Sequence, residues 1–392
     1  MDHTNYNTIF HRESEKKATI IFKVDKLTDN ELRNINNFVR DNNIEELIVK
    51  GTKDNSVVPK EAFLECDSLK KVIIDGTIDY IFDSAFATCE QLQEVILSKN
   101  LLVIGNNAFS ECLSLNNIVI PNKVSHIGSG VFSYCDALTN IVLGKHIKYI
   151  GDDAFAYSAI QSNGQDNILV IPDSVKYIGK RAFSECLNLS QIQLSISMKI
   201  IAEECFKNCM GLEYVRVDMD CLLKSIAPNA FENCENLKLF GPNYDSARSV
   251  FRELRDMPEE TFPGVIIIPN RMTLLGASAF YGCKLIEYII LGKSLNFIQN
   301  KDNDVFYRNM DIVASPAFNI IASKYIRKIA IPENCRGKLE KFFPASPYFD
   351  ARPDNFEYYD THTRSAMGSK KRKSRKSRKS KTIIKNKKSK KY

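Results

Sequence analysis

Residues 171–194 read IPDSVKYIGKRAFSECLNLSQIQL, and this stretch decides the fold. Its skeleton is P-x-x-V-x-x-I-G-x-x-A-F-x-x-C-x-x-L-x-x-I-x-L, in which the apolar residues stand at fixed offsets from Phe183. Nearly every other segment between residues 59 and 310 copies or interrupts this pattern. Self-similarity with a period of about 20 to 50 residues is typical of stacked repeats, in which each unit packs only on its neighbours. We therefore predict a solenoid.

Ten phenylalanines mark the units of this array. The first five lie 23 residues apart, and the later spacings are less even. They are Phe63, Phe86, Phe109, Phe132, Phe155, Phe183, Phe206, Phe231, Phe280 and Phe306. A small residue precedes most of them, and a Cys stands three residues after eight of them. Because free Cys behaves as a small buried hydrophobe, we expect reduced thiols that fill the core rather than disulfides.

Each unit ends in the pattern L-x-x-I-x-I, whose apolar residues alternate as they do in a β-strand. One such strand per repeat, always in the same direction, predicts a parallel sheet built by stacking. Glycines follow Ile or Leu at a second bend, where either a positive φ or close packing would favour Gly. These are Gly105, Gly128, Gly151, Gly179 and Gly276.

The repeat resembles the BspA-like leucine-rich repeats, a 23-residue class first associated with bacterial and protozoan surface proteins. The resemblance covers about residues 51–335 and implies an α/β repeat, a curved leucine-rich-repeat solenoid with its parallel sheet on the concave face. For function it implies binding, because the family shares no catalytic residues. The Lys-, Asn- and Ile-rich composition and the basic tail also resemble giant-virus proteins.

Residues 1–50 match no repeat, and we expect them to cap the first open face of the array. Residues 1–17 are polar and are expected to lack regular structure. A strand is predicted over residues 18–24, followed by a helix that begins with a capping box of Thr28 and Glu31 and ends near Asn43. A second strand from Leu47 completes a β-α-β unit.

The repeat array, residues 51–335, is interrupted near residues 241–264. Within this insertion Asp245 to Met257 predict a short helix that Pro258 stops. Insertions in solenoids usually project from one face as loops, so this one is either a spacer or a partner site. Residues 336–360, rich in Phe and Tyr, are predicted to form a C-terminal cap.

Residues 361–392 form a basic tail. It holds 15 of the 54 Lys and Arg and no acid, which leaves 39 bases against 47 acids in residues 1–360. We expect it to be disordered, because so few apolar residues cannot offset the entropy cost of folding. Its cations suit salt-sensitive phosphate contacts with nucleic acid, and residues 370–376 also resemble a nuclear localisation signal; a purely solubilising tail is the alternative. The candidate polyanion-binding residues are Lys370, Lys371, Arg372, Lys373, Arg375, Lys376, Arg378, Lys379 and Lys381.

The sequence offers little for an active site. Among its five His, His126 and His146 fall in corresponding bends of successive repeats and are interpreted as surface residues. Cys205 and Cys209 lack the paired spacing of a zinc site, and no phosphate loop, GxSxG or HExxH motif occurs. We therefore predict no catalytic residue, no metal and no cofactor. We expect no membrane association either, since no stretch approaches the roughly 18 apolar residues of a membrane span.

The penultimate residue of each strand should point outward from the concave face. These candidate protein-binding residues are Ile73, Ile96, Val119, Val142, Gln193 and Arg216. An exposed apolar stripe can mark a protein interface, although β-branched residues also favour strands for their own sake. The flanking positions are polar with no dominant charge, which fits a protein or peptide partner better than DNA.

Together these patterns predict a non-enzymatic, monomeric scaffold that binds an unidentified protein through the concave face or the insertion, with the tail engaging nucleic acid or directing nuclear import. The N-terminus has no apolar signal region, so we expect an intracellular location, cytoplasmic or nuclear, or a place in a virion. A surface or virion-associated adhesin-like protein is the alternative, and export with oxidised cysteines would favour it.

Overall fold

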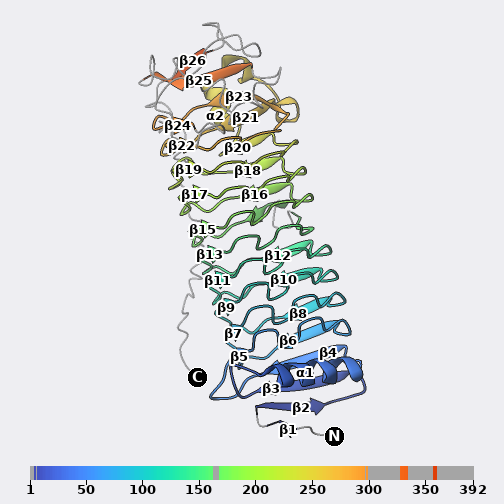
Figure 1. Ribbon diagram of the computed structural model, residues 1–392. Helices are drawn as coiled ribbons and strands as arrows, with labels where there is room; N and C mark the ends of the chain where they lie inside the picture. Colours follow the sequence, from blue (N-terminus) through green and yellow to red (C-terminus); the bar gives the residue numbers. More distant parts are fainter. Residues whose placement is uncertain are drawn as a thin grey trace, which may run out of the picture.

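The computed structural model of the chain describes residues 4–5, 7–161, 167–295, 297–298, 327–333 and 356–359. Figure 1 shows the turns of the chain stacked in a column that rises from the N-terminal strands to β25 and β26. Phe306, most of the expected C-terminal cap and the whole basic tail lie outside the described residues. The predicted fold class, a leucine-rich-repeat solenoid of parallel strands, is confirmed, although the described repeats themselves contain no helix.

The L-x-x-I-x-I segments form the longer strands, and these pair in parallel with equivalent residues side by side, as Val119 does with Val142. The first sheet continues through β4 (Glu46–Lys50), β6 (Lys71–Ile74), β8 (Glu94–Ile96), β10 (Asn117–Val119) and β12 (Asn140–Val142). The second contains β14 (Leu169–Val170), β16 (Gln191–Gln193), β18 (Tyr214–Arg216), β20 (Leu239–Gly241), β21 (Gly264–Ile267), β23 (Ile286–Ile290), β25 (Lys328–Pro332) and β26 (Phe356–Tyr359). We call this series the long-strand ladder.

A second ladder of two-residue strands lies on another side of the column, so the expectation of one strand per repeat is wrong. One sheet contains β5 (Val57–Val58), β7 (Tyr80–Ile81), β9 (Val103–Ile104), β11 (His126–Ile127), β13 (Tyr149–Ile150) and β15 (Tyr177–Ile178). The other contains β17 (Ile200–Ile201), β19 (Ser225–Ile226), β22 (Leu274–Leu275) and β24 (Phe297–Ile298). Two residues are too few to show an alternating pattern, and only the hydrogen bonds between turns define them as strands.

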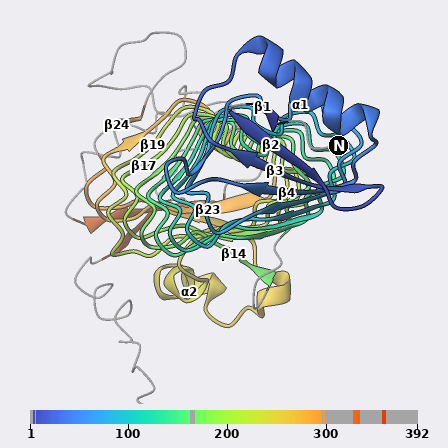
Figure 2. The ribbon, with the colours of Figure 1, turned by 90° about the horizontal axis from the view of Figure 1, so that it is seen from below.

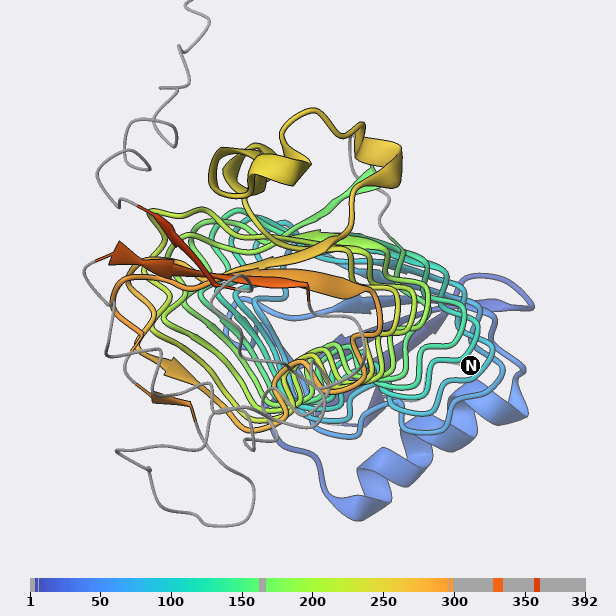
Figure 3. The same cartoon turned by 90° about the horizontal axis from the view of Figure 1, so that it is seen from above.

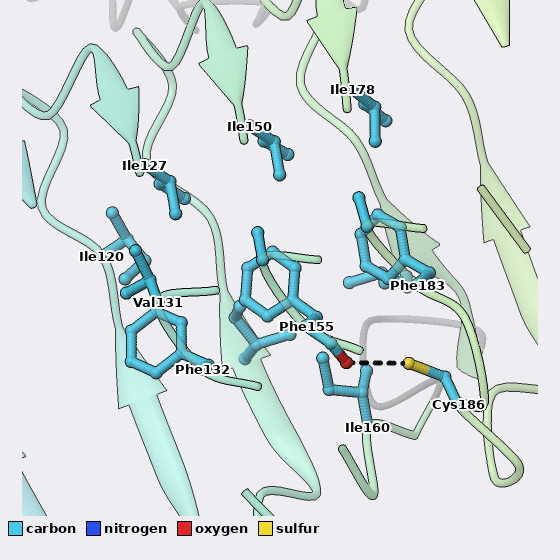
Figure 4. Close-up of a cluster of buried hydrophobic side chains, with 14 of the residues drawn as sticks. Ile120, Ile127, Val131, Phe132, Ile150, Phe155, Ile160, Ile178, Phe183 and Cys186 are labelled. Carbon is cyan, nitrogen blue, oxygen red and sulfur yellow. Dashed lines mark hydrogen bonds between the residues drawn. The ribbon is translucent and has the colours of Figure 1, made fainter. Parts of the chain in front are cut away.

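The core is built from columns of identical side chains. Phe132, Phe155 and Phe183 stack with ring centroids 5.6 Å and 5.2 Å apart, and the stack continues in both directions from Phe63 to Phe280. Figure 4 shows these rings and the thiol of Cys186, which donates a hydrogen bond to the carbonyl oxygen of Phe155 at 3.2 Å. All ten cysteines among the described residues are buried free thiols, as predicted.

The glycines at the second bend are required by close packing. None of the five has a positive φ. A Cβ on Gly105 would lie 2.7 Å from the backbone nitrogen of Asp83, and one on Gly151 would lie 2.5 Å from the carbonyl carbon of Gly128. Such distances are shorter than van der Waals contact, so a larger residue would push successive turns apart.

At the N-terminus the β-α-β unit is present as β3 (Lys17–Phe22), α1 (Asp29–Asp41) and β4, with the capping box of Thr28 and Glu31. The expectation that residues 1–17 lack regular structure is wrong. They contribute β1 (Thr4–Asn5) and β2 (Thr8–Arg12), and β2 pairs antiparallel with β3. The reason is Phe10, which is buried and packs against the ring of Phe38 in α1 at 4.8 Å.

The insertion leaves the ladder at Gly241, whose φ of +148° favours Gly. It forms α2 (Asp245–Val250) and two single 3-10 turns, Arg252–Leu254 and Glu259–Thr261. The predicted helix to Met257 is therefore too long. Phe251 takes an extended conformation and ends α2, because its ring turns inward onto Tyr288, with centroids 4.8 Å apart.

Candidate protein-binding face

The predicted outward residues do lie on the outer side of the long-strand ladder. Ile96, Val119 and Val142 are 44%, 58% and 50% exposed. Arg216 is exposed, whereas Ile73 and Gln193 are partly buried. The geometry of the predicted stripe is thus as expected, and its role in binding stays a prediction.

Sequence reasoning missed one member of the stripe. Val170 is 48% exposed and pairs in register with Gln193. The residues inserted after Phe155 shift Val170 away from the usual offset, so a count from the phenylalanines passes over it. The tetrapeptide LVIP at 169–172 could have identified it, because it nearly repeats IVIP at 118–121. We call Ile96, Val119, Val142 and Val170 the bare strand face.

The surroundings of the bare strand face carry little charge. Along one side, the strands begin with Glu94, Asn117 and Asn140. Two residues after each member of the face stand Ser98, Pro121, Gly144 and Pro172, all of them uncharged. Ion pairs begin at the N-terminal end, where Lys71 and Glu94 lie 2.8 Å apart. The centre of the bare strand face is therefore an apolar surface whose flanking side chains are mostly uncharged.

Farther along the ladder, the same outer side is covered by the insertion. The outward residues of β20, β21, β23 and β25 form a second apolar cluster with side chains from the insertion. From the ladder it contains Leu239, Val265, Ile267, Tyr288, Ile290 and Ala330, and from the insertion Tyr244, Ala247, Phe251, Leu254 and Phe262. Figures 2 and 3 show α2 outside the turns, against the long strands. The insertion is therefore a fold-back cover rather than a projecting loop.

Aromatic contacts and charges fix this cover in place. The rings of Tyr244 and Phe262 lie 4.3 Å apart, and the guanidinium of Arg248 sits 5.1 Å from the centroid of Phe262. Glu253 pairs with Lys328 of β25 at 2.9 Å. A cavity of about 450 Å³ lies between the cover and the ladder, but its cationic lining residues already have partners: Arg327 pairs with Glu287 at 2.6 Å and Lys238 with Glu213 at 3.1 Å.

The described residues hold no cluster of three or more His, Cys, Asp and Glu that could bind a metal ion. His126 and His146 are exposed, and the Nδ1 atoms lie 2.7 Å from Ser125 Oγ and 2.9 Å from the carbonyl oxygen of Asn122. Within the same part of the chain, no helix is long and apolar enough to span a bilayer.

Burial keeps the thiols protonated and therefore unreactive. Burial raises the pKa of Cys135 and of Cys186 to about 12, and burial also raises the pKa of Cys205 and of Cys209. Cys209 donates a hydrogen bond to the carbonyl oxygen of Phe183 at 2.9 Å. Since the thiolate is the reactive and metal-binding form, these side chains act as packing groups at neutral pH.

The family model of the BspA type leucine-rich repeat region, which comprises 6 copies of the repeat, matches residues 56–166, 162–246 and 259–336. These segments make up more than half of the chain. The chain belongs to this family. No curated protein matches this BspA-type repeat protein.

Solved structures are similar in fold. A leucine-rich repeat protein from Bacteroides ovatus is 16% identical, with 92% of this chain and 100% of that chain covered and a TM-score of 0.45. A leucine-rich repeat protein from T. pallidum is 22% identical, with coverage of 60% and 91% and a TM-score of 0.37.

Proposed function

We propose that this BspA-type repeat protein is a non-enzymatic scaffold whose bare strand face binds a protein partner. The observation that carries the proposal is the contrast along one ladder. Where the insertion is present, it buries the outward side chains of β21 and β23; where it is absent, Ile96, Val119, Val142 and Val170 stay exposed. Contiguous exposed aliphatic side chains of this kind mark interaction sites.

The insertion also indicates the chemistry of the partner. It covers the ladder with a short helix and with aromatic side chains, chiefly Phe251 and Phe262. The bare strand face also presents aliphatic side chains, and apart from Glu94 its flanking residues are uncharged. A partner segment that is amphipathic, with aromatic or aliphatic residues on one side and polar residues on the other, fits this surface best.

A pull-down with the full chain as bait tests the face. Ile96→Glu combined with Val119→Glu places two charges in its centre, and we expect a partner captured by the unchanged chain to be lost. Leu187→Glu combined with Ile196→Glu is the matched control, because these exposed residues lie elsewhere on the surface and are 51% and 42% exposed. Equal capture by both variants would remove the face from the proposal.

The tail adds a second proposed activity. Its composition, with 14 cations between Lys370 and Lys391, supports non-specific binding to nucleic acid or recognition by the import machinery, and hence a cytoplasmic, nuclear or virion location. Changing the nine tail cations from Lys370 to Lys381 to Gln should abolish most salt-sensitive retention on double-stranded DNA. Thermal unfolding should not change, and unaltered retention would exclude the tail.

A further inference from the structure

Four lysines form a row on the short-strand side of the solenoid. Each stands directly before a short strand, and backbone hydrogen bonds join Lys176 to Lys148 at 2.9 Å and Lys224 to Lys199 at 2.8 Å. Strands β15 and β17, which follow Lys176 and Lys199, are also neighbours. All four side chains are exposed. We call Lys148, Lys176, Lys199 and Lys224 the lysine row.

Within the described part of the chain, the lysine row is not neutralised by acids. Other lysines pair closely, as Lys180 does with Glu203 at 3.0 Å, but no member of the row lies within ion-pair distance of a carboxylate. Some acids close to the row in sequence have other partners, as Asp173 accepts the backbone N–H of Ile196 at 3.4 Å. Asp152 accepts the backbone N–H of Lys180 at 2.8 Å, and Asp218 accepts that of Asp220 at 2.8 Å.

The fold does not require lysine at this position. Other turns place Asp79, Leu102, Ser125 and Thr273 there. Neighbouring turns are about 4.8 Å apart, so four successive ammonium groups repel one another. A row of like charges that the core does not need is explained if an anion binds along it.

Two exposed aromatic side chains stand beside the lysine row. The residues that follow the four lysines are Tyr149, Tyr177, Ile200 and Ser225, and the two tyrosines are 42% and 41% exposed. The ring of His126 stacks on Tyr149 with centroids 4.8 Å apart. The insertion packs on the long-strand ladder and leaves this side uncovered. Proteins bind single-stranded nucleic acid with a row of cations along the phosphate backbone and with aromatic rings on which the bases stack.

We propose that the lysine row and its adjacent tyrosines bind single-stranded nucleic acid along the solenoid axis. The site belongs to the folded body and does not depend on the basic tail. The phosphates of the nucleic acid would contact Lys148, Lys176, Lys199 and Lys224, and its bases would stack on Tyr149 and Tyr177. Because the row lies outside the bare strand face, a protein partner and the nucleic acid could bind together.

Fluorescence anisotropy with a labelled oligo(dT) probe tests this proposal. All variants are made in the full chain with all 15 Lys and Arg of residues 361–392 changed to Gln, so that tail binding does not contribute. The slope of log K against log salt is negative, and changing the four row lysines to Gln should make it less negative by about 3, since each cation accounts for about 0.7 on single strands. An unchanged slope would overturn the proposal.

A control variant separates the lysine row from net charge. Lys23, Lys26, Lys53 and Lys60 are exposed at the N-terminal end, and changing them to Gln removes the same total charge. We expect this variant to keep the slope of the tail-neutral parent. Equal losses in the two variants would mean that only the overall charge attracts the probe, which would also overturn the proposal.

The tyrosines distinguish nucleic acid from other polyanions. Tyr149→Ala with Tyr177→Ala should weaken oligo(dT) binding about 30-fold or more through lost stacking of two bases, while heparin binding stays the same. Replacing both by Phe keeps the rings and should restore the affinity. If the Ala variant binds oligo(dT) as tightly as its parent, the row binds polyanions through charge alone and nucleic acid is the wrong ligand.

Discussion

The long-strand ladder has two regions that differ most on their outer side. Val119 in β10 and Ile267 in β21 occupy equivalent positions, yet Val119 is 58% exposed and Ile267 is fully buried. Stacked phenylalanines and buried thiols lie beneath both regions. The repeat pattern thus specifies the buried side-chain columns of the core, whereas the insertion, which is not part of the repeat, determines whether the outer side of the ladder is covered.

The largest effect is expected from placing a charge at equivalent positions of the two regions. Ile267→Glu would bury an unpaired carboxylate under the insertion and should lower the free energy of unfolding by about 3–5 kcal/mol. Val119→Glu places the same charge in water and should change it by less than about 0.5 kcal/mol. Denaturant unfolding measures both values, and similar losses would mean that Val119 is covered in solution.

An intermediate effect on stability is expected from the buried thiols, which are present in both regions. Burial raises the pKa of Cys135 to about 12 and also raises the pKa of Cys234, whereas an unfolded thiol titrates near pH 8.5. Above that pH the unfolded chain loses protons that the folded chain keeps, so the free energy of unfolding falls as pH rises. Each thiol should contribute about 1.4 kcal/mol per pH unit.

Single Cys→Ser variants at these two positions check the prediction. Ser occupies the equivalent place at Ser158 and does not titrate in this range, so each variant should flatten the pH dependence by the same amount. Unfolding curves between pH 8 and pH 10 give the slopes. Unequal flattening would show that the cores beneath the two regions differ.

The smallest effect is expected from the ion pair that joins the insertion to the ladder. Glu253→Gln removes the carboxylate that pairs with Lys328 at 2.9 Å, but both side chains are about a third exposed, at 36% and 31%. Solvent screening should limit the loss of stability to about 1 kcal/mol or less. Hydrogen exchange of α2 and β25 measures it locally. A larger loss would mean that charge, rather than apolar contact, holds the insertion on the ladder.

The repeated side chains were predictable because each repeat confirms the others. The residue types of Phe183 and Cys186 recur at constant offsets, because side chains at equivalent positions in successive turns must fill the same space in the core. Elements without a repeat were harder to predict. Strand β2 depends on Phe10 packing against Phe38, and the end of α2 depends on Phe251 packing against Tyr288. Both contacts join distant parts of the chain.

The sequence by itself determined the parallel stack, its core columns and the outward direction of residues such as Val119, because period and alternation express which side of each strand faces the interior. Only the tertiary structure decided which outward residues stay exposed, since the insertion must fold back onto β21 and β23 before Ile267 is buried. It also revealed the lysine row, whose members are at least 23 residues apart in sequence and become neighbours only when the turns stack.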